Sequence, residues 1–250
     1  MGKIIAFAGK GGTGKSTTAA LTIRLIREKK LGSILAVDAD PNSNLGELLG
    51  IDVKATIGSI LEDIGSSPDK VPAGMTKERF IEYEVQSSVE EGSGFDLLTM
   101  GRPEGPGCYC YVNNVLRNVM AKLIKDYDYV VIDNEAGLEH LSRKTTKNAD
   151  TFVIISDASV IGLKAAKRII GLIKELKISV KDRFLLINRP GADFDKKKAE
   201  SLGIEYLGAV PFDQEIERLS LNGIPLIELD EHSASLDHLR KIGEKIWQRN

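Results

Sequence analysis

Short apolar segments alternate with longer amphipathic ones along the whole chain of 250 residues. Tyr129-Val130-Val131-Ile132 is a continuous apolar run, typical of a parallel strand that is covered on both faces. The same pattern, or a close variant, predicts strands at Lys3–Ala8, Ser33–Asp38, Phe95–Met100, Tyr129–Asp133, Thr151–Ser156, Phe184–Asn188 and Tyr206–Val210.

Helical spacing of apolar residues fills the segments between these strands. It predicts helices that start at Thr17 and cover Val112–Lys125, Gly162–Leu176 and the shorter Thr76–Glu84, whereas residues 65–68 and 90–94 indicate loops. Strands that alternate with helices predict an α/β fold with one doubly wound, mainly parallel sheet flanked by helices. No repeat or linker interrupts the pattern, so we expect a single domain over residues 1–250.

Polar residues follow the ends of several predicted strands. Right-handed crossovers bring these ends to one edge of a parallel sheet. Asp38, Arg102, Asp133, Asp157 and Asn188 are therefore expected to converge near the loop that follows the first strand.

That loop carries the most informative motif of the chain. It reads Gly9-Lys10-Gly11-Gly12-Thr13-Gly14-Lys15-Ser16, with Thr17 next, and it joins a strand to a helix as a P-loop does. Glycines let backbone N–H groups surround a phosphate, and the helix N-terminus adds partial positive charge. Lys15 is expected to reach the β- and γ-phosphates and Ser16 to ligate Mg²⁺. Lys10 is not needed by a P-loop and could reach a nucleotide in a facing subunit.

Carboxylates at two further strand ends complete the predicted nucleotide site. Of Asp38 and Asp40, one can hold a Mg²⁺-bound water and the other can orient the attacking water, which we favour over the alternative that Asp40-Pro41-Asn42 forms only a turn. Asp133 ends an apolar strand in the Walker B arrangement. Gly137 could then offer a backbone N–H to the γ-phosphate.

Together these motifs resemble the deviant Walker A ATPases, the class that contains MinD, ParA, ArsA and the nitrogenase iron protein. The resemblance covers nearly the whole chain and implies a face-to-face homodimer held by ATP, with Lys10 crossing to the partner's phosphates and Asp40 activating water. It also implies that Asn188 reads the adenine, followed by Arg189, and that Pro211 and Asp213 of a Pro-x-Asp segment form a further part of the site. Arg189 and Asp213 could instead be ordinary polar loop ends.

Composition excludes several other classes. With 42% hydrophobic residues, 28% charged residues and a formal charge of −2, the chain has no bulk electrostatic reason to bind nucleic acid or an anionic membrane. We find no signal peptide and no membrane-spanning run, so we expect a cytoplasmic protein with reduced thiols.

The only two cysteines, Cys108 and Cys110, lie in a glycine- and proline-rich loop at residues 101–111. In an extended segment, positions i and i+2 face the same way, so both sulfurs would project together. A closed metal site usually needs four ligands, and a twofold dimer would supply the other two. A shared four-sulfur site for nickel, or zinc in the isolated protein, is our interpretation. Two buried structural cysteines are the alternative.

This loop is also similar to the Cys-x-Cys loop of CooC-type nickel-insertion ATPases, which serve carbon monoxide dehydrogenase, as the related AcsF serves acetyl-CoA synthase. The resemblance rests on residues 100–110 and implies an ATP-dependent metallochaperone with one of these enzymes as client. Residues 134–146 hold no cysteine, unlike the nitrogenase iron protein. An iron–sulfur redox ATPase and a ParA- or MinD-type positioning ATPase remain alternatives.

The C-terminal segment is relevant to the alternative of a MinD-type positioning ATPase. Leu236, Leu239, Ile242 and Ile246 form an amphipathic pattern that a MinD-like membrane tail would share, but we favour a helix packed on the sheet. His232 and His238 are expected to face solvent, as is Lys196–Lys198.

Overall fold

A computed structural model describes residues 2–66, 71–102, 110–135 and 148–248, with the backbone alone at 110–114. Every strand expected from the sequence is present, with slightly different bounds. The strands are β1 (Lys3–Gly9), β2 (Ile34–Ala39), β3 (Glu90–Glu91), β4 (Asp96–Thr99), β5 (Tyr129–Asn134), β6 (Asn148–Ser156), β7 (Ser179–Asn188) and β8 (Glu205–Val210).

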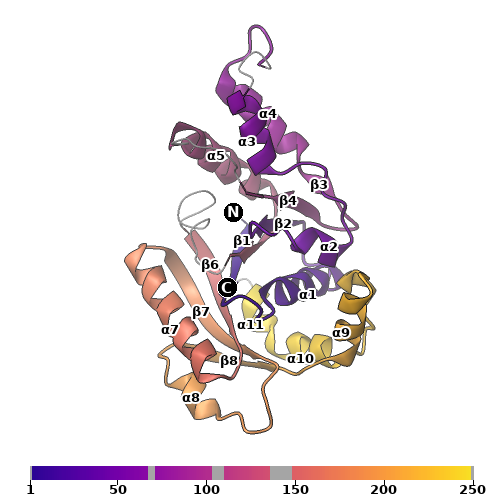
Figure 1. The fold of residues 1–250 in the computed structure, drawn as a ribbon, viewed down its shortest axis with the longest axis vertical. Helices are drawn as coiled ribbons and strands as arrows, with labels where there is room; N and C mark the ends of the chain where they lie inside the picture. The colour runs from indigo at the N-terminus through magenta and orange to yellow at the C-terminus, as the bar shows by residue number, and fades with distance from the viewer. Residues whose placement is uncertain (1, 67–70, 103–109, 136–147, 249–250) are drawn as a thin grey trace.

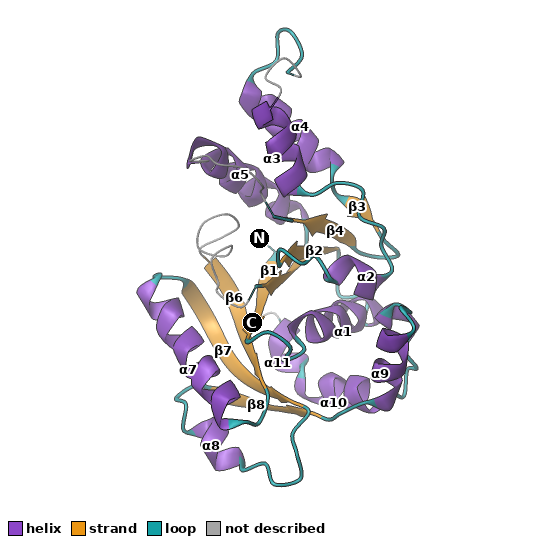
Figure 2. Cartoon of the chain, viewed as in Figure 1, coloured by secondary structure: helices purple, strands orange, loops and turns teal. Residues whose placement is uncertain are grey.

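The strands form one eight-stranded sheet in the order β3-β4-β2-β5-β1-β6-β7-β8 (Figures 1 and 2). All neighbours are parallel except β3 and β4. The chain passes from β1 to β2 on one side and later continues through β6 on the other. The loop after β1 therefore lies at the point where the strand order reverses, which is where α/β sheets bind ligands. The predicted α/β, mainly parallel fold is confirmed.

Helices cover both faces of this sheet (Figure 2). Their bounds are α1 (Lys15–Glu28), α2 (Leu45–Leu49), α3 (Ile57–Ser66), α4 (Lys77–Ser87), α5 (Cys110–Leu123), α7 (Val160–Glu175), α8 (Lys196–Glu200), α9 (Gln214–Leu221), α10 (Ala234–Ile242) and α11 (Glu244–Trp247). Short 3₁₀ helices lie at Ile124–Asp126 and Leu226–Glu228.

Alternate residues of β1 point into two separate apolar layers, as the pleat requires. Ile4 and Ala6 pack with residues of α3, α4, α5 and α7. Ile5 and Phe7 pack with α1, α2, α10 and α11. Burial on both faces explains why the central strands are uninterrupted apolar runs.

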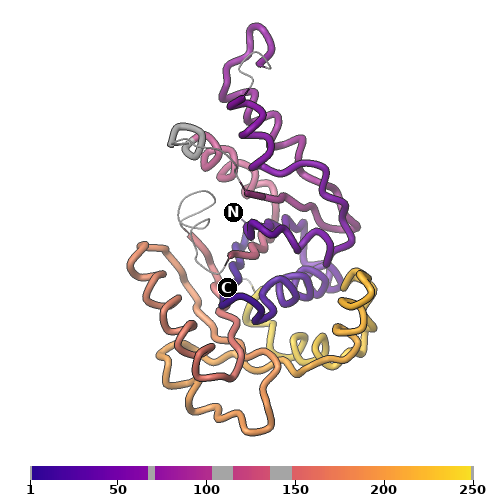
Figure 3. Tube along the Cα trace, in the orientation of Figure 1, coloured from indigo at the N-terminus to yellow at the C-terminus, as the bar shows by residue number. Residues whose placement is uncertain are grey.

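The segment between β2 and β4 differs most from the sequence-based expectation. It contains α3 and α4 side by side (Figure 3), and the short strand β3 forms in a region that we expected to be a loop. Helix α3 has a continuous buried stripe, Ile57, Ile60, Leu61 and Ile64, which packs on the sheet. Gly65 and Ser66, which we expected to lie in a loop, are the last residues of this helix.

The C-terminal helices pack on the rest of the fold, as we expected for the amphipathic C-terminal segment. Leu236, Leu239 and Ile246 are fully buried, and Trp247 is 2% exposed. Helix α10 packs against β8 and α1, and α11 packs against β1 and β6. His232, His238 and Lys196–Lys198 are exposed, as expected. Within the described residues, no helix is long and apolar enough to cross a membrane.

Candidate nucleotide site

The loop after β1 has the backbone geometry that its glycines permit. Gly12 and Gly14 have φ values of 77° and 90°, in the left-handed region that favours glycine. A Cβ on Gly9 would lie 2.2 Å from the Ile155 carbonyl oxygen, so only glycine lets β1 and β6 approach here. Helix α1 then begins at Lys15 with neither a side-chain cap nor an acidic residue in its first turn. Its N-terminal N–H groups and partial positive charge suit an anion.

The end of β7 contacts the outside of this loop. The Asn188 Nδ2 donates to the Thr13 carbonyl oxygen at 2.8 Å, and the Arg189 Nη2 donates to the Gly12 carbonyl oxygen at 2.6 Å. Asn188 also packs closely on Gly14, where a Cβ would lie 2.3 Å from Nδ2. These contacts join segments that are 175 residues or more apart in the sequence.

Asp133, at the end of β5, is fully buried beside the start of α1. Neither of its carboxylate oxygens has a hydrogen-bond partner of normal geometry among the described residues. Burial raises the pKa of this carboxyl to about 6, while the nearby Ser16 hydroxyl and Lys15 ammonium lower it and Asp40 raises it. A buried, unpartnered carboxylate is costly unless a cation completes it. The oxygens of Asp133 and Ser16 therefore fit Mg²⁺, which prefers oxygen ligands.

Asp38 is the register partner of Asp133 on the neighbouring strand β2 and is also fully buried. Its oxygens accept the Asp40 N–H at 3.1 Å and the Leu45 N–H at 2.8 Å, which fixes the start of α2. Burial is the main reason that the pKa of Asp38 rises to about 7; the Leu45 and Asp40 N–H groups oppose it, and the charges of Asp133 and Asp40 add to it. The structure thus places Asp38 in a bridging role between the site and α2.

Asp40 is partly exposed at the mouth of the site. Its Oδ1 accepts both the backbone N–H and the side-chain amide of Asn42, at 3.0 and 2.9 Å. The segment therefore forms a turn, which does not by itself decide between the two interpretations. Asp40 also lines the cleft that contains the P-loop, so its predicted role in orienting water stays a prediction.

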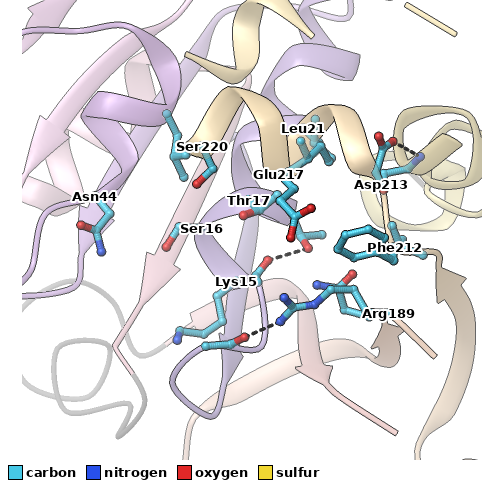
Figure 4. Close-up of a pocket in the computed structure, with 18 of the residues that line it drawn as sticks. Lys15, Ser16, Thr17, Leu21, Asn44, Arg189, Phe212, Asp213, Glu217 and Ser220 are labelled. Carbon is cyan, nitrogen blue, oxygen red and sulfur yellow. Dashed lines mark hydrogen bonds between the residues drawn. The ribbon is translucent and has the colours of Figure 1, made fainter. Parts of the chain in front are cut away.

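A cleft of about 610 Å³ extends from the P-loop along α1, between α2 and α9. Figure 4 shows Lys15, Thr17, Arg189, Phe212 and Glu217 around this cleft. Of the residues predicted from the sequence, the lining includes, besides Lys15, Thr17 and Arg189, also Gly11, Gly12, Gly14, Ser16, Asp40, Asn188, Pro211 and Asp213. The volume falls in the range typical of small-molecule sites.

Asp213 shapes the wall of the cleft because it begins helix α9. Its oxygens accept the Glu215 N–H at 3.0 Å and the Ser235 N–H at 2.8 Å. Burial raises the pKa of the Asp213 carboxyl, but the Ser235 N–H, the Ser233 hydroxyl and further N–H groups lower it more, so the pKa lies below its usual value.

The sequence did not single out the side chains of α9 that line the cleft. Glu217 and Leu221 belong to this wall, and Leu221 is 81% exposed. Phe212, 50% exposed, lies between two residues that were predicted. An aromatic residue inside the Pro-x-Asp segment was the one available signal.

Several predicted residues lie elsewhere. Arg102 and Asp157 are not in the cleft lining, and Asp157 accepts the Ser159 N–H at the start of α7, so their convergence on the P-loop stays a prediction. Gly137 and Cys108 lie outside the described residues.

Cys110 is the first residue of α5, earlier than the expected helix start at Val112. The alternation argument for an extended pair therefore does not apply to Cys110. Among the side chains that are described, no group of three or more His, Cys, Asp or Glu residues could hold a metal ion. The shared four-sulfur site stays a prediction.

A P-loop at the reversal point of a parallel sheet, backed by a buried aspartate on an adjacent strand, defines a P-loop nucleotide-binding fold. The chain belongs to the AAA domain family, whose model matches residues 2–186.

Individual relatives agree with this assignment. The chain is 46% identical over 248 residues to an uncharacterized ATP-binding protein of Methanocaldococcus jannaschii, covering 97% of this chain and 98% of that protein. It is 28% identical over 239 residues to the carbon monoxide dehydrogenase accessory protein CooC of Rhodospirillum rubrum, covering 90% and 89%. Among solved structures, the cell division ATPase MinD of Pyrococcus furiosus superposes with a TM-score of 0.71 at 22% identity, covering 98% of each chain.

Proposed function

We propose that this chain is a single-domain ATPase that binds ATP with Mg²⁺ and hydrolyses it to ADP and phosphate. The observation that carries the proposal is the buried, unpartnered carboxylate of Asp133 beside Lys15 and Ser16. Lys15 is 6% exposed at the first turn of α1, where it can reach phosphate oxygens. When bound, Mg²⁺ would neutralise charge on the phosphates, held by Ser16 and Asp133.

The orientation of Asn188 supports adenine as the base. Its amide nitrogen uses one of its two N–H groups to donate to the Thr13 carbonyl oxygen, and Oδ1 remains as the acceptor. An acceptor matches the 6-amino group of adenine, whereas guanine presents a carbonyl oxygen at that position. Phe212 and Pro211 supply apolar surface to the same cleft.

A hydrolysis assay tests this proposal. Lys15→Ala should lose ATP hydrolysis, because its contact with the β- and γ-phosphates has no replacement, while the exposed control Lys198→Ala should keep it. GTP should compete at least about tenfold more weakly than ATP if Asn188 selects the base. Undiminished hydrolysis by Lys15→Ala, with the control unchanged, would contradict the assignment.

We further propose that the ATPase is a nickel metallochaperone for carbon monoxide dehydrogenase or a related enzyme such as acetyl-CoA synthase. Two lines of support join here: the Cys108-Tyr109-Cys110 loop in the sequence, and the similarity over nine-tenths of the chain to a protein named as a carbon monoxide dehydrogenase accessory protein. Nickel is the cargo in this proposal. ATP would close a homodimer through the exposed Lys10, and hydrolysis would reopen it.

Nickel titration of the reduced, metal-free protein tests the second proposal. We expect one metal ion per dimer, with a thiolate-to-metal absorbance that rises together with dimer mass, because half of the ligands come from each chain. Cys108→Ala/Cys110→Ala removes every thiol of the chain and should abolish both signals. Tight binding of one ion per monomer would contradict a shared site.

Two outcomes would instead favour the other functions. Stoichiometric iron and sulfide would indicate a redox ATPase. Salt-sensitive DNA binding or lipid-stimulated turnover would indicate a MinD- or ParA-type protein, although the burial of α10 and α11 leaves no free C-terminal tail among the described residues.

A further inference from the structure

Arg189 has an unusual backbone conformation for its position. Lys30, Ser43, Lys177 and Arg189 are the non-glycine residues with positive φ in the described parts of the chain. Lys30 and Lys177 follow α1 and α7, where a left-handed residue commonly ends a helix. Ser43 closes a turn by donating its N–H to the Asp40 carbonyl oxygen at 3.0 Å.

No helix ends at Arg189, which follows strand β7 with φ of 50°. Its N–H donates to the Val210 carbonyl oxygen at 2.8 Å, and its guanidinium reaches the Gly12 carbonyl oxygen at 2.6 Å. A strained conformation persists only where surrounding contacts enforce it, and such strain gathers at functional sites. At Arg189 the left-handed backbone conformation occurs together with the hydrogen bond from its side chain to the P-loop.

Two consecutive P-loop peptides are held by two consecutive residues. Arg189 holds the carbonyl of Gly12 and Asn188 holds the carbonyl of Thr13. Because a trans peptide directs its N–H opposite to its C=O, the Gly14 N–H then points away from β7, on the side where Gly14 lines the cleft.

The first of these peptides also controls Lys10. The Thr13 N–H and the Thr13 hydroxyl both donate to the Lys10 carbonyl oxygen, at 3.3 and 2.7 Å. Rotation of the Gly12–Thr13 peptide would therefore release the turn that carries Lys10. The Arg189 guanidinium opposes this rotation, because it is hydrogen-bonded to the Gly12 carbonyl oxygen of the same peptide.

From these contacts we infer that Arg189 is a positioning residue, which shapes the P-loop for the phosphates of ATP instead of reading the base. This inference rests on the proposed ATP site. A guanidinium suits the role because it stays charged and its hydrogen bond to a carbonyl is stronger than that of a neutral donor.

Arg189→Gly tests the inference, because glycine adopts the left-handed conformation without strain but removes the guanidinium. The matched control is Lys177→Gly, which relieves the same backbone strain at an exposed helix end. Both variants should keep a Tm within about 3 °C of the wild type. Arg189→Gly alone should bind ATP, and also base-free tripolyphosphate, at least about tenfold more weakly.

Arg189→Lys should recover most of the lost affinity, since an ammonium can donate to the same carbonyl. Loss of ATP affinity with normal tripolyphosphate affinity would overturn the inference and make Arg189 a base contact. Wild-type affinity for both ligands in Arg189→Gly would overturn it as well. A wild-type chain that binds no ATP would instead refute the proposed function itself, and the inference with it.

Discussion

Replacing Asp133 by asparagine should stabilise the metal-free protein at neutral and alkaline pH. The side chain is fully buried, and its two oxygens have no hydrogen-bond partner of normal geometry in the described parts of the chain. Asparagine has nearly the same shape but carries no charge. The substitution therefore removes mainly the cost of burying an ionised carboxylate.

The pKa shift gives the magnitude and the sign. Burial raises the pKa of Asp133 from 3.8 to about 6. Between these values the folded protein keeps a proton that the unfolded chain has lost, so the free energy of unfolding falls as pH rises from about 4 to 6 and then stays low. At about 1.4 kcal/mol per pKa unit, the cost above pH 6 is about 3 kcal/mol.

Thermal unfolding in buffer with EDTA measures this effect. At pH 8 the Tm of Asp133→Asn should exceed that of the wild type by about 6–12 °C, given about 2–4 °C per kcal/mol for a chain of this size. At pH 5 the gain should be about half as large, because the wild type is then mostly protonated in the folded state. Saturating Mg²⁺ and ATP should reverse the order, since Asp133 is then a ligand.

Asp150→Asn is the matched control, on strand β6 of the same sheet. The Asp150 carboxylate accepts the Ile4 N–H at 2.9 Å and is paired with Lys181. Burial raises its pKa, but these partners lower it further, to below the usual value. Asparagine should therefore lower the Tm at pH 8. A variant of Asp133 that is no more stable than the wild type at pH 8, or equally stabilised at pH 5 and pH 8, would refute the reasoning.

Four other substitutions test separate parts of the structure. Asp40→Asn keeps the turn acceptor, so ATP should still bind while turnover falls at least about 100-fold; near-normal turnover would exclude a water-orienting role. Lys10→Ala should bind nucleotide but lose the dimer formed with a non-hydrolysable ATP analogue, as sedimentation would show. Gly14→Ala should lower both Tm and ATP affinity, because its Cβ would lie 2.3 Å from the Asn188 amide nitrogen and φ is 90°. Trp247→Ala should cost about 3–5 kcal/mol in a denaturant titration, and a change below about 1 kcal/mol would indicate a loosely attached tail.

Residues of the predicted nucleotide site that are adjacent in the sequence also lie together in the structure. Lys15 and Ser16 follow the glycines at fixed spacing, and the structure places them beside Asp133 at the end of β5. The position of Arg102 and Asp157 after a strand end did not place them in the cleft lining, because a strand end does not say which way the chain then turns. Asp157 turns toward α7 and accepts the Ser159 N–H.

The sequence by itself predicted most of the strands and several of the helices of this protein, together with the P-loop motif. The periodicity of apolar residues and the spacing of glycines depend only on residues that are close in the sequence. The strand at Tyr129–Ile132 and the motif at Gly9–Ser16 could therefore be predicted without knowledge of any long-range contact.

Only the tertiary structure decided which distant residues lie together at the predicted site. Asp38 and Asp133 became a buried pair because β2 and β5 are neighbours in register. Asn188 and Arg189 became supports of the P-loop because β7 ends beside it, although the contact spans 175 residues. Such contacts depend on strand order and register, which are set by the packing of the whole sheet and not by any local pattern.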